Sequence, residues 1–538
     1  MGTRERRAAG VKTAPMRWPV AVGGLTGLVI AAWAQGAAAQ APGAGAPSGD
    51  AACQALAQPG QFPNTAVSSA KMVAGGPATR GQAFCEVTAT LSPVAGSRIG
   101  VVYRLPAAWN GKLIGYGGGG WAGNVRLETA ADDLARGYAT LQTDGGHPSP
   151  QPFDASWVAP GGKPDEVALN DFAWRGVHTM TETGKLVAMR YYGRPQEKAY
   201  FEGCSTGGRM ALMEAQRFPG DYDAIIAGAP VYSLRVQLAE IYRDWIFAQP
   251  GAAVTPAQVD LVHKAVLNAC DSLDGVKDGV LADPRACRFD PVVLQCKAGQ
   301  SGDQCLTPAQ VTAFRREYET VRGPDGTPYV FGYARGSEPG WIGALNITAD
   351  PKKAAEARDL QLRAPMFGDP NFSFASFDPL RDTPRARSSA FAKYYEADNP
   401  DLRPFLNKGG KLILWHGLDD QLPSPWGTVD YYQRLEKASA PAAKAGVRLI
   451  LEPGVLHCGG GPGANTFDLV AALDTWVEHG APPERIVGEK VTRNPFGPPP
   501  AEPAPEGPRM TRPVCAYPAF PRYAGKGDTN DAQNFVCR

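Results

Sequence analysis

The chain has 538 residues, of which 54 are basic and 53 acidic, so its formal net charge is +1. A chain of this length has room for a large hydrophobic core in about two to four domains. The balanced charge argues against a nucleic-acid partner.

The first 39 residues have the three parts of a secretory signal peptide. A basic segment precedes an apolar run at residues 20–34, and Ala37-Ala38-Ala39 offers small residues for cleavage before Gln40. The apolar run is short for a membrane span, so an uncleaved anchor is the less favoured alternative; Met16 is an alternative start. We therefore expect a secreted or periplasmic protein with no membrane association after cleavage.

The next recognisable elements are short apolar runs that are typical of strands, at residues 99–105, 112–116 and 138–142. Further along, the pattern predicts a helix, a strand, a helix and a strand, at residues 168–192, 199–201, 209–216 and 224–228. This alternation indicates an α/β fold with a parallel sheet covered by helices.

The alternation is interrupted at residues 233–405, a segment with many Gly, Pro and aromatic residues and four cysteines. It resumes with strands expected at residues 411–416 and 447–451 and a closing helix expected at 467–479. The predicted parts are a catalytic domain at residues 40–232 and 406–490, an inserted domain at 233–405 and a proline-rich extension at 491–538.

Gly203-Cys204-Ser205-Thr206-Gly207 has the G-x-S-x-G form of a nucleophile elbow. A strand is expected before it and a helix after it, which is the context that this turn requires. The glycines matter because the turn is strained and bulky neighbours would collide with the helix. A simple glycine-rich turn is the alternative, and the flanking elements favour Ser205 as a nucleophile.

A serine nucleophile needs a histidine base and a carboxylate that orients the imidazole. In the α/β-hydrolase fold these residues follow in the order Ser, Asp, His, and His457 stands in the right order beside glycines and a cysteine. Asp419 and Asp420 come directly after an expected strand; we favour Asp420 and keep Asp419 as the alternative. His416 is expected to be structural.

An oxyanion hole needs two backbone N–H donors. Thr206, directly after the nucleophile, is expected to supply one. The other is expected from the run Gly117-Gly118-Gly119-Gly120, which follows an early strand as the glycine loop of esterases does. Gly119 or Gly120 is the predicted donor, and a flexible turn without this role is the alternative.

The ten cysteines form an even set behind a signal peptide, which indicates disulfides in an oxidising compartment. The spacing suggests four local pairs: Cys53–Cys85, Cys270–Cys287, Cys296–Cys305 and Cys515–Cys537. Cys204 and Cys458 flank the candidate serine and histidine and would then pair with each other, although spacing alone does not fix the connectivity. A zinc site formed by the cysteines is disfavoured because no C-x-x-C pair occurs.

Cys204-Ser205, His457-Cys458 and the acid segment His416-Gly417-Leu418-Asp419-Asp420 together resemble the tannase and feruloyl esterase family. That family includes bacterial mono(2-hydroxyethyl) terephthalate hydrolases. The glycine run 117–120 and the segment Gly336-Ser337-Glu338-Pro339-Gly340-Trp341 also match. The resemblance implies an α/β-hydrolase fold in which the inserted domain is a lid over Ser205, and esters of aromatic acids as substrates.

Residues 271–280 carry three aspartates among turn glycines, a donor set that suits a hard cation such as Ca²⁺. The resemblance implies a structural Ca²⁺ braced by Cys270–Cys287, and no organic cofactor. Its implied ligands are Asp271, Asp274 and Asp278 with the carbonyl groups of Val276 and Val280. An acidic turn without a metal ion is the alternative.

The sequence therefore predicts a serine esterase that hydrolyses esters of phenolic acids and acts as a monomer or homodimer on a small-molecule substrate. A hydrolase of terephthalate monoesters and a non-catalytic phenolic-binding protein are the alternatives. Aromatic and basic side chains of the insertion could contact the substrate, and the sequence does not choose among them: Trp341, Phe367, Phe372, Arg335 and Arg363.

Overall fold

The computed structural model describes residues 49–149, 151, 156–158, 160, 164–344, 366–369, 371–491 and 510–538, with no side chains described for 342–344. All of them belong to one compact unit, Gly45–Arg538. The predicted signal segment, Arg363 and most of the proline-rich stretch lie outside the described residues.

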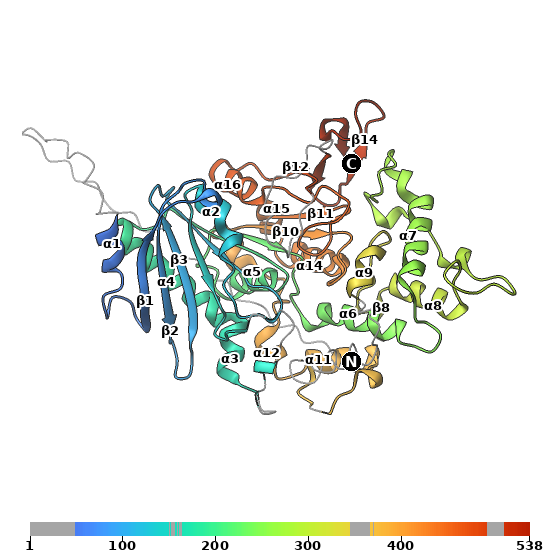
Figure 1. The fold of residues 1–538 in the computed structure, drawn as a ribbon, viewed down its shortest axis with the longest axis horizontal. Helices are drawn as coiled ribbons and strands as arrows, with labels where there is room; N and C mark the ends of the chain where they lie inside the picture. Colours follow the sequence, from blue (N-terminus) through green and yellow to red (C-terminus); the bar gives the residue numbers. More distant parts are fainter. Residues whose placement is uncertain are drawn as a thin grey trace, which may run out of the picture. The chain divides into compact units, whose positions relative to one another are not determined.

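A nine-stranded sheet forms the centre of this unit, in the order β1-β2-β3-β5-β4-β6-β7-β10-β11 (Figure 1). Its strands are β1 (Thr65–Val73), β2 (Phe84–Leu91), β3 (Ile99–Pro106), β4 (Lys112–Tyr116), β5 (Ala139–Thr143), β6 (Lys198–Cys204), β7 (Ala224–Gly228), β10 (Lys411–Gly417) and β11 (Val447–Glu452). The pairs from β1 to β5 are antiparallel, and all pairs from β5 to β11 are parallel. The predicted, mostly parallel α/β-hydrolase sheet is therefore confirmed.

Burial along the strands follows from the two kinds of pairing. In β2 and β3, buried residues alternate with partly exposed ones, because an antiparallel edge can face solvent on one side. In β5 and β7 every residue is buried, as expected for strands covered by helices on both faces. The continuous apolar runs that predicted these strands thus reflect their central position.

Helices cover the sheet and connect its parallel strands. They are α1 (Asp50–Ala55), α2 (Ala131–Ala135), α3 (Glu166–Asn170), α4 (Gly176–Tyr192), α5 (Thr206–Arg217), α14 (Pro425–Ala438), α15 (Ala442–Gly446) and α16 (Leu469–His479). The helix predicted at residues 168–192 is divided by a π-helical turn, Asp171–Arg175, between α3 and α4. The arrangement places α5 directly after β6, where the nucleophile elbow was expected.

The described residues between β7 and β10 contribute no strand to the nine-stranded sheet. Its described elements are α6 (Leu234–Phe247), α7 (Pro256–Cys270), α8 (Pro308–Glu317), β8 (Val321–Arg322), β9 (Pro328–Val330), α9 (Glu338–Ala344), α11 (Pro379–Arg387), α12 (Ala392–Tyr395) and α13 (Arg403–Leu406). Figure 1 shows α7, α8 and α9 grouped together, in green to yellow.

Two helices of this segment begin at the same sequence signal. Thr255 before α7 and Thr307 before α8 cap their helices, and each is followed by Pro at the first helical position and Gln at the third. Each Gln side chain accepts a hydrogen bond from the N–H of its threonine, which completes a capping box.

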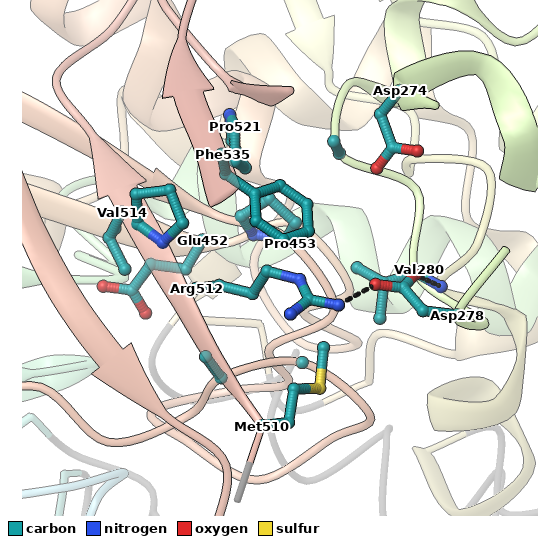
Figure 2. Close-up of a pocket in the computed structure, with 14 residues that line it drawn as sticks. Asp274, Asp278, Val280, Glu452, Pro453, Met510, Arg512, Val514, Pro521 and Phe535 are labelled. Atoms are coloured by element: carbon teal, nitrogen blue, oxygen red, sulfur yellow. Dashed lines mark hydrogen bonds and ion pairs between the residues drawn. The ribbon is translucent and has the colours of Figure 1, made fainter. Parts of the chain in front are cut away.

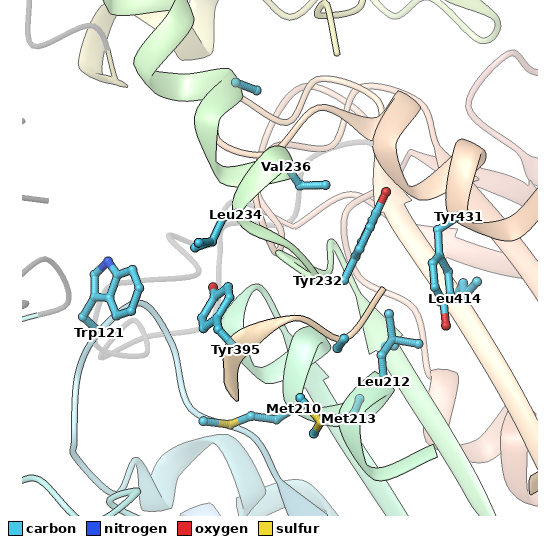
Figure 3. Packing of buried hydrophobic residues seen from close by; sticks show 14 of the residues in the cluster. Trp121, Met210, Leu212, Met213, Tyr232, Leu234, Val236, Tyr395, Leu414 and Tyr431 are labelled. Atoms are coloured by element: carbon cyan, nitrogen blue, oxygen red, sulfur yellow. The ribbon is translucent and has the colours of Figure 1, made fainter. Parts of the chain in front are cut away.

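The insertion shares its hydrophobic core with the sheet domain. Figure 3 shows Tyr232, which precedes α6, with Leu234 and Val236 of α6; Met210 and Leu212 of α5 belong to the same hydrophobic cluster. The same cluster includes Tyr395 of α12, Leu414 of β10 and Tyr431 of α14. A second cluster on the sheet, with Ile114, Ile413 and Trp476, involves α16.

The described residues from Arg485 to the C-terminus form two short antiparallel ribbons. One pairs β12 (Arg485–Glu489) with β13 (Thr511–Cys515), and the other pairs β14 (Pro521–Tyr523) with β15 (Phe535–Cys537). The Cys515–Cys537 disulfide joins them, and the N–H of Tyr517 donates to the carbonyl of Leu449 in β11. These contacts attach the extension to the edge of the main sheet.

Candidate active site

Ser205 lies on a sharp turn between β6 and α5. Its backbone has φ 64° and ψ −123°, an unfavourable conformation for a residue with a side chain. A Cβ on Gly203 would lie 2.4 Å from the carbonyl oxygen of Gly207, and one on Gly208 would lie 2.3 Å from that of Gly228. Glycine is therefore required on both sides of the strained serine.

The glycine run packs directly against this turn. A Cβ on Gly117 would lie 2.5 Å from Cα of Gly207, and one on Gly207 would lie 2.8 Å from the carbonyl oxygen of Gly118. Within the described residues, the N–H groups of Thr206, Gly119 and Gly120 have no backbone acceptor. Thr206 opens α5, where the first N–H groups have no partner inside the helix, so donors from both segments are available beside Ser205.

The four segments that carry the candidate residues follow four parallel strands of one sheet. The glycine run follows β4, Ser205 follows β6, Asp420 follows β10 and His457 follows β11. The carboxyl ends of parallel strands lie at the same edge of a sheet, where ligands bind in open α/β folds. Residues that are distant in the sequence thus converge at this edge.

The Cys204–Cys458 disulfide ties the nucleophile turn to the histidine loop, with 5.9 Å between the two Cα atoms. Consecutive Cα atoms are 3.8 Å apart, so the Cα atoms of Ser205 and His457 are at most about 13.5 Å apart. The four local pairs suggested by spacing are also disulfides in the structure: Cys53–Cys85, Cys270–Cys287, Cys296–Cys305 and Cys515–Cys537.

Asp420 and His457 form a buried pair. Nδ1 of His457 lies 2.8 Å from Oδ2 of Asp420, whose Oδ1 accepts the N–H of Leu422 at 2.8 Å. Nε2 of His416 is 3.1 Å from the same Oδ2, while its Nδ1 is 2.7 Å from Oγ1 of Thr428. His416 is thus a buried partner of the acid, and Asp420 is the aspartate that faces His457.

In the Asp420–His457 pair, each residue stabilises the charged form of the other. Burial alone would raise the pKa of the Asp420 carboxyl, but the imidazoles of His457 and His416 outweigh it and lower the pKa to about 2. Burial opposes protonation of His457, but the Asp420 carboxylate outweighs burial and raises the pKa of the imidazole above its ordinary value of 6.5. Asp420 is therefore charged throughout the physiological pH range.

Asp419 points away from this pair, toward the insertion. One of its oxygens has no hydrogen-bond partner in the described part of the chain, and burial together with the neighbouring Glu338 raises the pKa of Asp419 to about 7. Glu338 accepts hydrogen bonds from the hydroxyl of Tyr318 at 2.7 Å and the N–H of Gly336 at 2.9 Å, and pairs with Nδ1 of His263 at 3.0 Å.

The segment 336–341 also supports the histidine loop, a role that the sequence did not reveal. A Cβ on Gly340 would lie 2.8 Å from Cβ of Gln421 and 3.2 Å from Cδ2 of Leu456. Oε1 of Gln421 accepts the N–H of His457 at 3.1 Å. Gln421 directly follows the acid, and only its place in that loop could have drawn attention to it.

The described lid candidates have structural contacts. Trp341 is fully buried and donates its Nε1–H to Oγ of Ser337 at 3.0 Å. Phe367 and Phe372 stack at 4.2 Å between ring centroids, and Arg335 donates to the carbonyl of Phe289 at 2.9 Å. None of these contacts is to Ser205, Asp420 or His457.

The loop with the candidate Ca²⁺ ligands lies beside the C-terminal ribbons (Figure 2). Asp274, Asp278 and Val280 line a cavity of about 20 Å³ together with Arg512, which pairs with Asp278 at 2.5 Å. Asp271 accepts the N–H of Gly279 at 3.1 Å, and Cys270 is bonded to Cys287 beside the loop. The ligand atoms of the three aspartates do not all lie within 4.8 Å of one another, so a cation would require the loop to tighten.

This donor set still fits a hard cation. Three carboxylates on one loop, with backbone carbonyl groups between them, are the oxygen ligands that Ca²⁺ prefers. A cavity of this size accommodates about one water-sized sphere.

No helix among the described residues is long and apolar enough to cross a bilayer.

Comparisons with known proteins agree with the fold and the motifs. Residues 85–538 match the family described as tannase and feruloyl esterase. The chain is 33% identical to the mono(2-hydroxyethyl) terephthalate hydrolase of Piscinibacter sakaiensis, over 90% of this chain and 91% of that protein. It is also 33% identical to a probable feruloyl esterase of Arthroderma benhamiae, over 84% of this chain and 85% of that protein.

A solved structure of a feruloyl esterase also resembles this chain. The crystal structure of feruloyl esterase B from Aspergillus oryzae aligns with a TM-score of 0.78 and 26% identity, covering 91% of this chain and 100% of that one. The chain therefore belongs to the tannase and feruloyl esterase family and is a carboxylic ester hydrolase.

Proposed function

We propose that the chain hydrolyses esters of aromatic, phenolic carboxylic acids with Ser205 as nucleophile, His457 as base and Asp420 as the orienting acid. The observation that carries the proposal is the buried Asp420–His457 pair, held beside the strained Ser205 turn by the Cys204–Cys458 disulfide. The feruloyl esterase names of several relatives support the substrate class.

The proposed reaction follows from the polarity of this pair. Asp420 accepts Nδ1–H of His457, which makes Nε2 the nitrogen that takes the Ser205 hydroxyl proton as Oγ attacks the ester carbonyl. The N–H groups of Thr206 and of Gly119 or Gly120 stabilise the negative oxygen of the tetrahedral intermediate. His457 then gives the proton to the leaving alcohol, and water hydrolyses the acyl-enzyme by the same steps in reverse.

A fluorophosphonate probe tests the mechanism against the alternative of a non-catalytic phenolic-binding protein. We expect stoichiometric labelling of Ser205 and no labelling of a Ser205→Ala variant, whose kcat should fall by several orders of magnitude. Unchanged hydrolysis of aryl esters by Ser205→Ala, or no labelling of the wild type, would refute the assignment.

A substrate panel distinguishes the two ester classes. Methyl ferulate and methyl gallate represent phenolic esters, and mono(2-hydroxyethyl) terephthalate represents the substrate named for the Piscinibacter relative. We expect the highest kcat/KM on a phenolic ester. A preference for the terephthalate monoester would favour the second class, and activity on short aliphatic esters alone would contradict both.

We further propose that the loop 271–280 binds one structural Ca²⁺ through Asp271, Asp274, Asp278 and the carbonyl groups of Val276 and Val280. When bound, the ion would supply positive charge to a loop rich in carboxylates and would take no part in the attack by Ser205. We also propose that the protein works in the periplasm or outside the cell. Five disulfides support this location, because they persist in oxidising compartments.

A further inference from the structure

A group of possible metal ligands lies between α4 and α5, outside the proposed active site. His178 of α4, Glu214 of α5 and Asp221 of the following loop each place one ligand atom within 4.8 Å of the other two. Within the described residues, no other group of three His, Cys, Asp or Glu side chains meets this condition. No part of the proposed mechanism uses these residues.

Glu214 gives the independent indication of a ligand. Its side chain is 1% exposed, and neither carboxylate oxygen has a hydrogen-bond donor among the described residues. An isolated buried carboxylate costs several kcal/mol unless it is paired or coordinates a metal. Ligand atoms of His178 and of a second carboxylate, Asp221, lie within 4.8 Å of the Glu214 carboxylate.

His178 has the arrangement of a metal-ligating histidine. Its Nδ1 faces Oδ2 of Asp221 at 2.7 Å, and its Nε2 faces Oε2 of Glu182 at 3.3 Å. Ligating histidines characteristically donate their second ring N–H to a carboxylate, which fixes the tautomer. The ring also stacks on Phe218 with 3.8 Å between centroids, so its orientation is set by packing.

The charges around the group also favour a cation. Glu182, Glu214 and Asp221 bring three carboxylates, while Lys185 binds the backbone carbonyl of Asp221 rather than a carboxylate. The C-terminal end of α5, three residues beyond Glu214, adds the negative end of a helix dipole.

We propose that His178 Nδ1, Glu214 and Asp221 bind one divalent transition-metal ion of the Zn²⁺ type. One imidazole and two carboxylates are ligands that Zn²⁺ accepts, and ligand atoms on a tetrahedral ion lie about 3.3 Å apart. Small side-chain rotations would bring the three atoms to this spacing. The side chains of His178 and Asp221 are 20% and 14% exposed, so solvent reaches the site and water can complete the coordination.

The ion would have a structural role. It would join α4 to the C-terminal part of α5, the helix that begins next to Ser205, and to the loop that leads into β7. Binding would therefore stabilise the fold behind the nucleophile without contact to the substrate.

The test uses untagged full-length protein that has been stripped with a chelator and dialysed. We expect the wild type to take up one equivalent of Zn²⁺, measured by calorimetry and elemental analysis, and to gain thermal stability in its presence. Glu214→Gln keeps the shape of the side chain and should lose the uptake. Glu182→Gln should weaken binding tenfold to a hundredfold, and the control Glu197→Gln, on the exposed Arg194 pair, should bind as the wild type does.

Co²⁺ provides a second readout that does not depend on stability. Its visible absorption in the wild type should indicate nitrogen and oxygen ligands, and should disappear in His178→Asn. Absence of equimolar Zn²⁺ uptake by the wild type, or equal uptake by Glu214→Gln, would overturn the proposal. The carboxyl groups of Glu214 and Asp221 would then share a proton instead of a metal ion.

Discussion

At the scale of single residues, one carboxylate oxygen organises the base. Oδ2 of Asp420 faces the imidazoles of both His457, at 2.8 Å, and His416, at 3.1 Å. Because His457 gives its Nδ1–H to Asp420, its Nε2 is the nitrogen left to accept a proton. Asp419, which precedes Asp420 in the sequence, instead faces Glu338 and His263 of the insertion.

The raised pKa of His457 predicts the acid limb of the pH profile. The base works only when neutral, so kcat/KM should fall as the pH drops through a value above the ordinary 6.5. For stability the sign is the opposite: the Asp420–His457⁺ interaction stabilises the fold below the unfolded pKa and is lost as the pH rises through the folded pKa. Rate profiles with a neutral ester measure this pKa, and a midpoint below 6.5 would contradict the prediction.

The two aspartates should respond differently to the same substitution. In Asp420→Asn the amide no longer selects the productive tautomer of His457, and such a change costs about 10⁴-fold in kcat in another serine hydrolase. Asp419→Asn removes a buried carboxyl that does not touch His457, and kcat should stay within a few-fold of the wild type. Steady-state kinetics of both variants test this difference. Similar losses of kcat in both variants would contradict the role given to Asp420.

At the scale of elements, the segment 336–341 acts on the active site through packing. We predict that Gly340→Ala lowers kcat ten- to a hundredfold, because the new Cβ would displace Gln421, which accepts the N–H of His457. A shift of about 1 Å in a catalytic group can have an effect of this size.

Gly76→Ala is the matched control, since a Cβ there meets nothing within 4 Å. Activity and circular dichroism should be measured together. If Gly340→Ala is folded and fully active, the segment does not position the histidine loop.

The Cys204–Cys458 disulfide joins two elements that are 254 residues apart in the sequence. Its replacement by two alanines should cost ~5 kcal/mol in the chain-entropy model, and should also lower kcat at temperatures where the protein remains folded. Replacing Cys296 and Cys305, separated by 9 residues, should cost less stability and leave kcat unchanged. Thermal melts and kinetics below the unfolding transition test the effects on stability and on kcat. A free thiol at Cys204 or Cys458 in active protein would contradict the role given to the Cys204–Cys458 disulfide.

At the scale of the whole molecule, the sequence predicts what depends on local pattern. The parallel strands were recognisable as continuous apolar runs because both of their faces are covered, as in β7. β1 was not predicted, because it lies at the sheet edge and none of its residues is fully buried. The motifs around Ser205, Asp420 and His457 were visible because the elbow turn, the chain order and the cysteines constrain nearby residues.

Long-range packing could not be predicted in this way. The Glu338–His263 pair and the contact of Gly340 with Gln421 join segments that are about 75 and 80 residues apart, and no local pattern specifies them. The single helix predicted at residues 168–192 was wrong in detail, since the sequence does not signal the π-helical turn at Asp171–Arg175.

The candidate Ca²⁺ loop connects the insertion with the C-terminal extension. Asp278 pairs with Arg512 of β13, and the carbonyl of Leu273 accepts a hydrogen bond from Arg522 of β14. A cation in this loop would hold together segments that are more than 200 residues apart in the sequence. Removing Ca²⁺ should therefore destabilise the protein, while kcat at low temperature should change little.

At 100 times its Kd, a ligand that binds only the folded state contributes about 2.7 kcal/mol, which corresponds to a Tm change of a few degrees. Scanning calorimetry after chelation should show this loss, and added Ca²⁺ should restore the original Tm, whereas Zn²⁺ at the same concentration should not replace it. Asp274→Asn should melt at the lower temperature with or without Ca²⁺, because the loop has lost a charged oxygen ligand. A wild-type Tm that is the same in chelator and in Ca²⁺ would show that the loop is an acidic turn without a metal ion.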